Sequence, residues 1–282
     1  ADNKCSLRAA VMEAESNSNS CNIIILEDNL TYELNIQGSG DASVGDLDIA
    51  SNLVIYSWIS TVPDFGESVV SAVDLEDRIF DVASDGSLYS IGINMAYGSS
   101  DLGGCLRVQE DGNLTGINTS FLNCTASDSG GGIYTQGSVL LSSIVVGVDN
   151  QYIYLGPSGI SHNTATNSGG GIFIDAGGTV YGEWLTSVIY NESSTGGGIY
   201  AIGDDSIGAN LITADFDTAY ITQNEATSGG GGVYLDDMAT FNLTDSRLGY
   251  NTAGSDSGGG LYIGVDAEAT IDRSTISANT SA

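Results

Sequence analysis

The stretch Ser129-Gly-Gly-Gly-Ile-Tyr134 returns along the chain in near-identical copies. The copies read SGGGIF at 168–173, TGGGIY at 195–200, SGGGGVY at 228–234 and SGGGLY at 257–262, with a degenerate LGGCLR at 102–107. Successive glycine runs begin 27 to 39 residues apart, which suits one coil of chain plus a variable loop. Near-copies at this spacing indicate a repeat protein in which each unit packs on its neighbours.

A second phrase precedes the glycine runs and places an apolar residue three positions before an asparagine. Ile160-Ser-His-Asn163 is one example, and Phe121-Leu-Asn-Cys124 has a cysteine at the asparagine position. In stacked coils these asparagines would lie about 4.8 Å apart, where side-chain amides hydrogen-bond along the stack. Asparagine also tolerates the left-handed backbone of a tight bend. The predicted asparagine ladder consists of Asn163, Asn191, Asn224, Asn251 and Asn279.

Glycine suits the corner of such a coil because it takes a positive φ without a Cβ clash. The residue after each run, such as Ile133, would point inward, and the next would point outward by the two-residue alternation of a strand. The predicted outward aromatic row consists of Tyr134, Phe173, Tyr200, Tyr234 and Tyr262. Such a row either stacks only to stabilise the solenoid or also binds sugar rings or a protein, and the sequence favours neither reading.

The residues before the strands have the pattern of an amphipathic helix. Over Ser6–Asn17, the apolar residues Leu7, Ala10, Val11 and Ala14 share one face. The charged residues expected to face away are Arg8, Glu13 and Glu15. A short helix on the open end of a stack would cover an apolar terminal coil. We therefore expect a cap at 1–22 and one all-β, β-helical domain at 23–282, with overt repeats from about 102 to 282.

The chain is strongly acidic, with 6 Lys plus Arg against 36 Asp plus Glu and a formal net charge of −30. Such a field repels phosphate backbones, so we expect no nucleic-acid partner. It attracts cations, but the acids are scattered, which favours a solvated surface over specific Ca²⁺ sites. No cofactor is predicted, and Ca²⁺ is the metal that these acids would bind.

Four cysteines occur without metal-like spacing, so two disulfides are expected. Three connectivities are open, and pairing of sequence neighbours would join Cys5 to Cys21 and Cys105 to Cys124. Disulfides and acidity favour a secreted, extracellular or cell-surface location. No run of 18 or more apolar residues exists, so no membrane span is expected.

These motifs together resemble two overlapping groups of proteins. The repeats look like those of polymorphic outer-membrane proteins, with their FxxN and GG[AG][ILV] signatures. The N-terminal half resembles bacterial surface and secreted proteins whose β-helix opens with a CSLREA-type segment, here CSLRAAV at 5–11, in which Ala9 departs from the commoner Glu. Further matching stretches lie at 22–26, 45–49 and 77–82. The resemblance covers essentially the whole chain and implies a right-handed parallel β-helix, often in adhesive extracellular proteins.

Few residues suggest chemistry. The weak calcium candidates Asp204, Asp205, Asp236 and Asp237 form two adjacent pairs, whose side chains would point to opposite faces of a strand. That geometry argues against a converging pair and favours solvated loops. His162 has no serine or cysteine partner in the sequence and is interpreted as a surface side chain.

The sequence therefore favours a non-catalytic structural or adhesive protein of the cell exterior. The chain stops at Ala282, where another glycine run is due, and an open solenoid end is an unpaired edge. We expect self-association through the ends, giving a head-to-tail filament or surface-layer subunit, with a glycan or cell-surface ligand as a further partner. The alternative is a polysaccharide lyase or hydrolase, or a glycan-binding module, on the same fold.

Overall fold

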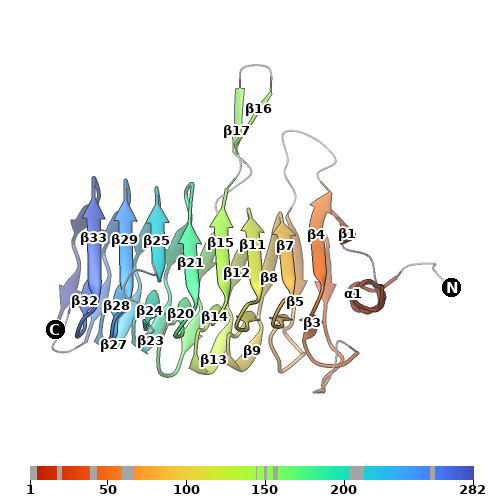
Figure 1. The fold of residues 1–282 in the computed structure, drawn as a ribbon, viewed down its shortest axis with the longest axis horizontal. Coiled ribbons are helices and arrows are strands. Elements are labelled where there is room, and N and C mark those ends of the chain that lie inside the picture. The colour runs from red at the N-terminus through yellow and green to blue at the C-terminus, as the bar shows by residue number, and fades with distance from the viewer. Residues whose placement is uncertain are drawn as a thin grey trace.

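A computed structural model describes residues 5–17, 21–38, 43–58, 67–143, 145–148, 151–154, 158–203, 213–254 and 258–282. The helix α1 (Leu7–Ser16) lies at one end of a long stack of short parallel strands (Figure 1). The stack is a parallel β-helix, which confirms the fold class predicted from the repeats. Among the described residues, no helix is long and apolar enough to cross a bilayer.

Four parallel sheets form the stack, and strands from successive coils pair within each sheet. Sheet A contains β1 (Asn22–Glu27), β4 (Asn52–Trp58), β7 (Ser87–Ile91), β11 (Asn113–Ile117), β15 (Ser138–Ser142), β21 (Thr179–Gly182), β25 (Ala214–Asp217), β29 (Thr240–Thr244) and β33 (Glu268–Asp272). Sheet B contains β2 (Thr31–Glu33), β5 (Ser68–Ser71), β8 (Ile93–Ala96), β12 (Ser120–Leu122), β18 (Gly159–Ser161), β22 (Ser187–Ile189), β26 (Tyr220–Thr222), β30 (Arg247–Gly249) and β34 (Thr275–Ser277).

Two further sheets complete each coil. Sheet C contains β3 (Leu47–Ile49), β6 (Phe80–Val82), β10 (Leu106–Val108), β14 (Ile133–Thr135), β20 (Ile172–Ile174), β24 (Ile199–Ala201), β28 (Val233–Leu235) and β32 (Leu261–Ile263). Sheet D contains β9 (Ser99–Leu102), β13 (Thr125–Ser129), β19 (Thr164–Ala165), β23 (Glu192–Thr195), β27 (Glu225–Gly229), β31 (Thr252–Ala253) and β35 (Thr280–Ser281). Between β15 and β18 the chain forms an antiparallel hairpin, β16 (Val145–Val148) with β17 (Gln151–Tyr154), that projects from the stack (Figure 1).

The core is a column of apolar side chains enclosed by the sheets. Alternate residues of each strand point inward, and residues at matching positions of successive coils stack on one another. A small residue lies next to a large ring at one place in this column. A Cβ on Gly182 would lie 2.4 Å from the ring of Phe216 on the next coil, so this glycine accommodates a fully buried phenylalanine.

The glycine run turns the chain from sheet D into sheet C, as the sequence predicted. Gly130 has a φ of 71°, and a Cβ on Gly131 would lie 2.2 Å from the carbonyl oxygen of Gly170 on the next coil. A Cβ on Gly132 would lie 3.0 Å from Nδ2 of Asn163. The first glycine is therefore required by its backbone conformation, and the other two by close approach of the next coil.

The run of four glycines at 229–232 keeps the same register. Gly229 pairs with Thr195, so it takes the place that a serine or threonine has in the other coils. The corner glycine is Gly230, with a φ of 63°. Aligning the runs by their first glycine, as the sequence suggests, was therefore wrong by one residue at this coil.

The predicted asparagines form a buried ladder of hydrogen bonds. Oδ1 of Asn191 accepts from both the backbone N and the Nδ2 of Asn163, each at 3.0 Å. Its Nδ2 donates to the carbonyl oxygen of Ile160 at 2.9 Å and to Oδ1 of Asn224 at 3.0 Å. Amides bond from coil to coil in this way through Asn163, Asn191, Asn224, Asn251 and Asn279. Each internal amide therefore uses its oxygen and both its N–H groups.

The left-handed backbone lies one residue before the ladder and not at the asparagines themselves. The seven residues at this corner have φ between 54° and 64°, although only two of them are asparagine or glutamine. We call them the corner row: Tyr97, Asn123, His162, Tyr190, Gln223, Tyr250 and Ala278. Their backbone conformation is unfavourable for most side chains, so the buried ladder next to them must hold it in place.

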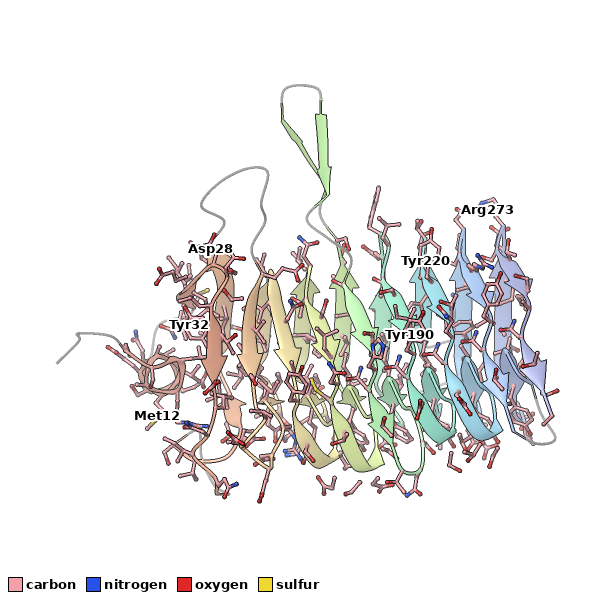
Figure 2. The ribbon with its side chains drawn as sticks, turned by 180° about the vertical axis from the view of Figure 1, so that it is seen from behind. Met12, Asp28, Tyr32, Tyr190, Tyr220 and Arg273 are labelled. Carbon is pink, nitrogen blue, oxygen red and sulfur yellow. A yellow bond between two sulfur atoms is a disulfide. The ribbon has the colours of Figure 1, made fainter. Side chains whose placement is uncertain are left out.

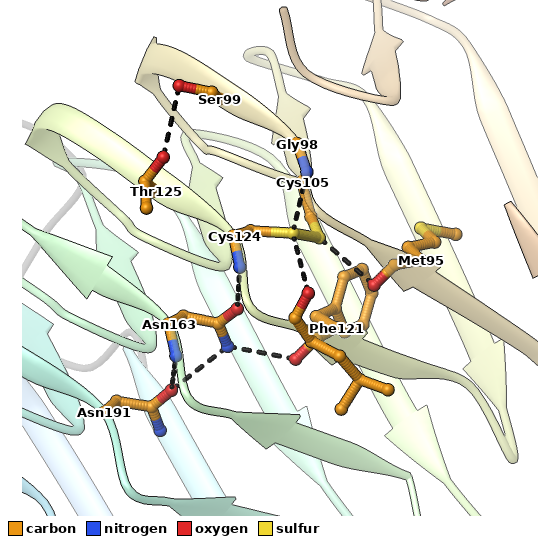
Figure 3. Close-up of a disulfide and its surroundings, with 10 residues drawn as sticks. Met95, Gly98, Ser99, Cys105, Phe121, Cys124, Thr125, Asn163 and Asn191 are labelled. Atoms are coloured by element: carbon orange, nitrogen blue, oxygen red, sulfur yellow. Dashed lines mark hydrogen bonds between the residues drawn. A yellow bond between two sulfur atoms is a disulfide. The ribbon is translucent and has the colours of Figure 1, made fainter. Parts of the chain in front are cut away.

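A disulfide replaces the ladder at its N-terminal end (Figure 3). Cys105 takes the place of the third glycine and Cys124 takes the place of the asparagine, and their Cα atoms are 5.4 Å apart. The Cβ of a third glycine would point at the asparagine of the next coil, so cysteines at these two positions face each other. The backbone N of Cys124 still donates to Oδ1 of Asn163 at 2.8 Å. The disulfide thus occupies the positions of one glycine–asparagine pair and links two coils covalently at that point.

The N-terminal cap differs from the prediction in two respects. Cys5 and Cys21 are exposed free thiols, so the structure does not form the predicted Cys5–Cys21 bridge. Leu7, Val11 and Ala14 pack the cap onto the core, and polar contacts add to this packing. Glu15, for example, accepts from the hydroxyl of Ser51 at 2.9 Å. Arg8 was expected to face away but is buried, because its guanidinium donates to carbonyl oxygens in the loop before β3.

Replacing the Cys105–Cys124 disulfide with the glycine and asparagine of the other coils tests whether the disulfide and the asparagine ladder have the same structural role. We expect Cys105→Gly with Cys124→Asn to fold, because the new amide would meet Gly98 N, Met95 O and Asn163 Oδ1. The matched variant with Cys124→Ala removes the side-chain partner of Gly98 N and Met95 O, whereas Asn163 Oδ1 keeps its bond from the backbone N of residue 124. Chemical denaturation should find the asparagine variant more stable than the alanine variant by about 2–4 kcal/mol. Equal stability of the two would contradict the ladder as a source of stability.

Candidate functional site

The outward aromatic row on sheet C is a continuous stack of rings. Ring centroids lie 4.3 to 5.4 Å apart from Tyr134 through Phe173, Tyr200 and Tyr234 to Tyr262, and neighbouring planes differ by 20° at most. Each ring covers the face of its neighbour, so these side chains are buried or half-buried. The ring faces in this row are already occupied, which favours the stabilising role over the binding of sugars.

Tyrosine hydroxyl groups of this row donate hydrogen bonds to aspartates of the following coil. The hydroxyl of Tyr134 donates to Asp175, which lies one residue beyond the end of the next strand of sheet C. Phe173 has no hydroxyl, and the corresponding residue of the coil after it is the apolar Ile202. Burial and the Asp175 carboxylate raise the pKa of Tyr134 above its ordinary range. This pairing of side chains again indicates a structural row.

The predicted calcium ligands do not gather into a site in the described part of the chain. Asp204 and Asp205 lie outside the described residues. Asp236 accepts from the hydroxyl of Tyr200 and, at 3.0 Å, from the backbone N of Asp237. The side chain of Asp237 is exposed. Asp236 therefore belongs to the aromatic row and to the turn that follows it.

Toward the N-terminus the same outward row holds charged residues in place of aromatic ones. The strand register places Asp48, Asp81 and Arg107 in line with Tyr134. Arg107 donates through Nε to Oδ1 of Asp81 at 3.1 Å and through Nη2 to Oδ2. Gln109 donates to the same Oδ1 at 3.1 Å. Ion pairing therefore joins coils here, where ring stacking joins them farther along.

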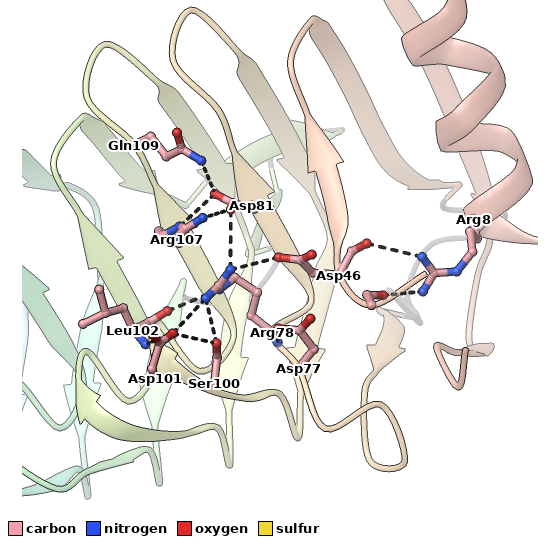
Figure 4. A network of polar contacts seen from close by, with 11 residues as sticks. Arg8, Asp46, Asp77, Arg78, Asp81, Ser100, Asp101, Leu102, Arg107 and Gln109 are labelled. Carbon is pink, nitrogen blue, oxygen red and sulfur yellow. Dashed lines mark hydrogen bonds and ion pairs between the residues drawn. The ribbon is translucent and has the colours of Figure 1, made fainter. Parts of the chain in front are cut away.

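Arg78 extends this cluster across three coils (Figure 4). Its Nη1 lies 3.0 Å from Asp46 Oδ2 and 3.5 Å from Asp81 Oδ2. Its Nη2 donates to the hydroxyl of Ser100 at 2.7 Å and to Oδ1 of Asp101 at 3.2 Å. One buried guanidinium thus satisfies side chains from both neighbouring turns.

The acids of this cluster are the best candidates for a cation in the residues that the structure describes. Carboxylate oxygens of Asp46, Asp48 and Asp81 lie within 4.8 Å of one another. Two of these carboxylates already pair with arginines, so a cation would have to displace Arg78 or Arg107. We interpret the cluster as a structural joint between the first coils and the repeats.

Burial raises the pKa of Asp46 to about 6; the negative charge of Asp77 adds to the shift and Arg78 opposes it. The folded protein therefore holds this proton more tightly than the unfolded chain, in which the pKa is about 4. Folding is favoured while Asp46 is protonated, and that advantage is lost as the pH rises from about 4 to about 6.

The variant Asp46→Asn tests this linkage because it keeps the shape and removes the proton. The free energy of unfolding of the wild type, measured relative to the variant, should fall by about 2 kcal/mol between pH 4 and pH 7. Urea denaturation at several pH values measures it. A constant difference across that range would contradict the raised pKa.

The corner row leaves aromatic rings open to solvent. Tyr97, Tyr190 and Tyr250 are 49%, 42% and 55% exposed. The exposed ring of His162 stacks on Tyr190 with centroids 5.0 Å apart, and the guanidinium carbon of Arg247 lies 4.7 Å from the centroid of Tyr250. The rings of Tyr190 and Tyr250 thus have a stacking partner and are still partly accessible to solvent.

A groove of about 390 Å³ opens in the corner row between Tyr190 and Tyr250. Gln223 lies in the coil between the two tyrosines, and Glu225 and Thr252 also line the groove. Tyr190 lies along the C-terminal half of the stack in Figure 2, which also labels the exposed Tyr220 on the strand β26. Aromatic walls with a few polar groups are typical of binding sites, so this groove is the candidate functional site.

Sequence reasoning missed this groove although the signal was present. The phrases around Asn191 and Asn251 were interpreted only for their asparagines, and the tyrosine before each was left out. Period-2 alternation does not describe a residue in the left-handed conformation, so the outward direction of Tyr190 and Tyr250 did not follow from it. An aromatic residue recurring directly before a buried ladder position is the signal that would have found the groove.

No family model, curated protein or solved structure matches the chain in comparisons with known proteins.

Proposed function

We propose that the protein is a non-catalytic structural and adhesive β-helix of the cell exterior, which binds ligands through its surface and leaves them unchanged. The observation that carries the proposal is the contrast between the two rows. The row on sheet C consists of rings and ion pairs that cover one another, whereas the corner row leaves its rings exposed to solvent. Accessible rings repeated along a rigid stack suit recognition of an extended surface.

Two further observations support a location outside the cell. The bridge between Cys105 and Cys124 is buried in the ladder, and disulfides persist in oxidising compartments. The segment at 5–11 resembles the opening of CSLREA-type secreted proteins, and the repeats resemble polymorphic outer-membrane proteins. Adhesion is a role that this resemblance implies.

The alternative function is a polysaccharide lyase or hydrolase on the same fold. Such an enzyme needs converging carboxylates, or a carboxylate with an arginine, in an open groove. In the part of the chain that the structure describes, the cluster around Asp81 has these groups, but Asp81 is 3% exposed and already paired with Arg107. The open groove between Tyr190 and Tyr250 has one carboxylate, that of Glu225.

Incubation with soluble polysaccharides separates binding from catalysis. We expect the protein to retain its ligand on a column or in sedimentation while the polysaccharide keeps its length. Reducing ends and unsaturated ends, measured over many hours, should stay at the level of a heat-denatured control. Accumulation of either product would overturn the non-catalytic proposal.

We also propose that copies of the chain associate through the ends of the stack. Ile276 and Ile271 occupy the inward registers of Leu248 and Leu243, which are fully buried one coil earlier. On the coil formed by β32 to β35 they are 51% and 36% exposed, and one further coil would bury them. Association of copies through this face would bury these two side chains.

A charge on this end face should prevent the association. We expect the protein to sediment faster with rising concentration, and Ile276→Asp to remain monomeric at every concentration. Met238→Asp is the matched control, because Met238 is also an exposed apolar residue, 46% exposed, but lies on the side of the stack. If Ile276→Asp associates as strongly as the wild type, the ends do not form the contact.

A further inference from the structure

We propose that the groove between Tyr190 and Tyr250 binds a sugar ring of an uncharged glycan, with the ring inserted between the two tyrosines. The inference rests on the proposed adhesive function and specifies the class of ligand that the surface of the stack binds. Strands of adjacent coils lie about 4.8 Å apart, so two coils separate the tyrosines by about 9.6 Å. Gln223, in the intervening coil, lies between them and is exposed.

The spacing selects the shape of the ligand. A flat ring between two aromatic faces needs about 7 Å, because each contact lies near 3.5 Å. A puckered pyranose carries C–H groups on both faces and is thicker, so it suits about 9.6 Å better than a flat ring does. Its C–H groups would meet the negative faces of the tyrosine rings. His162 and Tyr190, one coil apart in this row, lie face to face with ring centroids 5.0 Å apart.

The polar residues of the groove match the hydroxyl groups of a sugar. The amide of Gln223 both donates and accepts hydrogen bonds, Glu225 accepts, and the hydroxyl of Thr252 does either. Glu225 and Thr252 are paired neighbours on the outer faces of β27 and β31. Polar groups at the edge of an aromatic slot fix the orientation of a ligand that the rings hold by their faces.

Charge excludes acidic sugars from this groove. Glu225 lines it, and Glu192 lies beside Glu225 in the register of sheet D. The whole chain adds a formal net charge of −30. The cation nearest to the tyrosines, Arg247, stacks on Tyr250. A uronate would meet a repulsive field here, whereas a neutral hexose would not.

The same order of residues occurs once more in the corner row. Tyr97 and His162 are two coils apart, and Asn123 lies between them as Gln223 lies between the downstream tyrosines. All three side chains are exposed. Aromatic, amide and aromatic residues thus repeat three coils upstream, and the stack presents a second slot of the same type.

The variant Gln223→Tyr tests the proposal by filling the slot with a third ring. It keeps the fold, because tyrosine already occupies this left-handed position at Tyr190 and Tyr250. A second variant, Tyr190→Asn, removes one wall and uses a residue that the row carries at Asn123. The matched control Tyr220→Asn removes an exposed tyrosine that does not line the groove.

Saturation-transfer NMR and titration calorimetry with neutral gluco-, galacto- and manno-oligosaccharides, and with an oligouronate, provide the readout. We expect a neutral oligosaccharide to bind the wild type and Tyr220→Asn alike, and to bind Gln223→Tyr and Tyr190→Asn at least tenfold more weakly. The oligouronate should not bind. Binding that survives Gln223→Tyr, preference for the uronate, or no binding of any neutral sugar would overturn the proposal. Surface adhesion that persists without turnover in Gln223→Tyr would leave the proposed function standing, whereas turnover by the wild type would remove that function itself.

Discussion

The bond from each ladder amide to the coil before it is the interaction on which the rest of the structure depends. Oδ1 of Asn191 holds both the backbone N–H and the side chain of Asn163, so a position in one coil fixes the same position in the next. The third glycine of the run leaves room for this amide, and the left-handed residue before it turns the chain. The buried ladder and the exposed corner row are therefore two consequences of one bend.

Repetition made the inside of this protein predictable. A glycine run, as at 130–132, and an asparagine five to seven residues before the corner glycine identify a stacked coil. Glycine is needed there for its backbone angle and for close contact, and asparagine for the hydrogen bonds between coils. The stacked row that includes Tyr134 followed from alternation along a strand. Cys105 and Cys124 lie at repeat positions, so the register explains their pairing, which the sequence left as one of three connectivities.

The features that escaped prediction lie outside the repeat or depend on one backbone angle. Arg8 has a polar side chain in an amphipathic pattern, but its buried direction depends on carbonyl groups of a loop 37 residues away. Cys5 and Cys21 flank a cap that core packing and polar contacts hold, and no repeat fixes their distance. The exposed direction of Tyr190 depends on its φ of 57°, which the strand pattern does not contain.

Amide hydrogen exchange at Asn191, Asn224 and Asn251 tests most directly the claim that the ladder fixes the corner. Their backbone N–H groups donate to side-chain oxygens of the next coil at 2.9 to 3.0 Å. We predict that these amides exchange as slowly as those of the core strands, through global unfolding alone. Exchange at the rate of exposed turns would contradict the account, because neither the ladder nor the groove beside it would then be fixed.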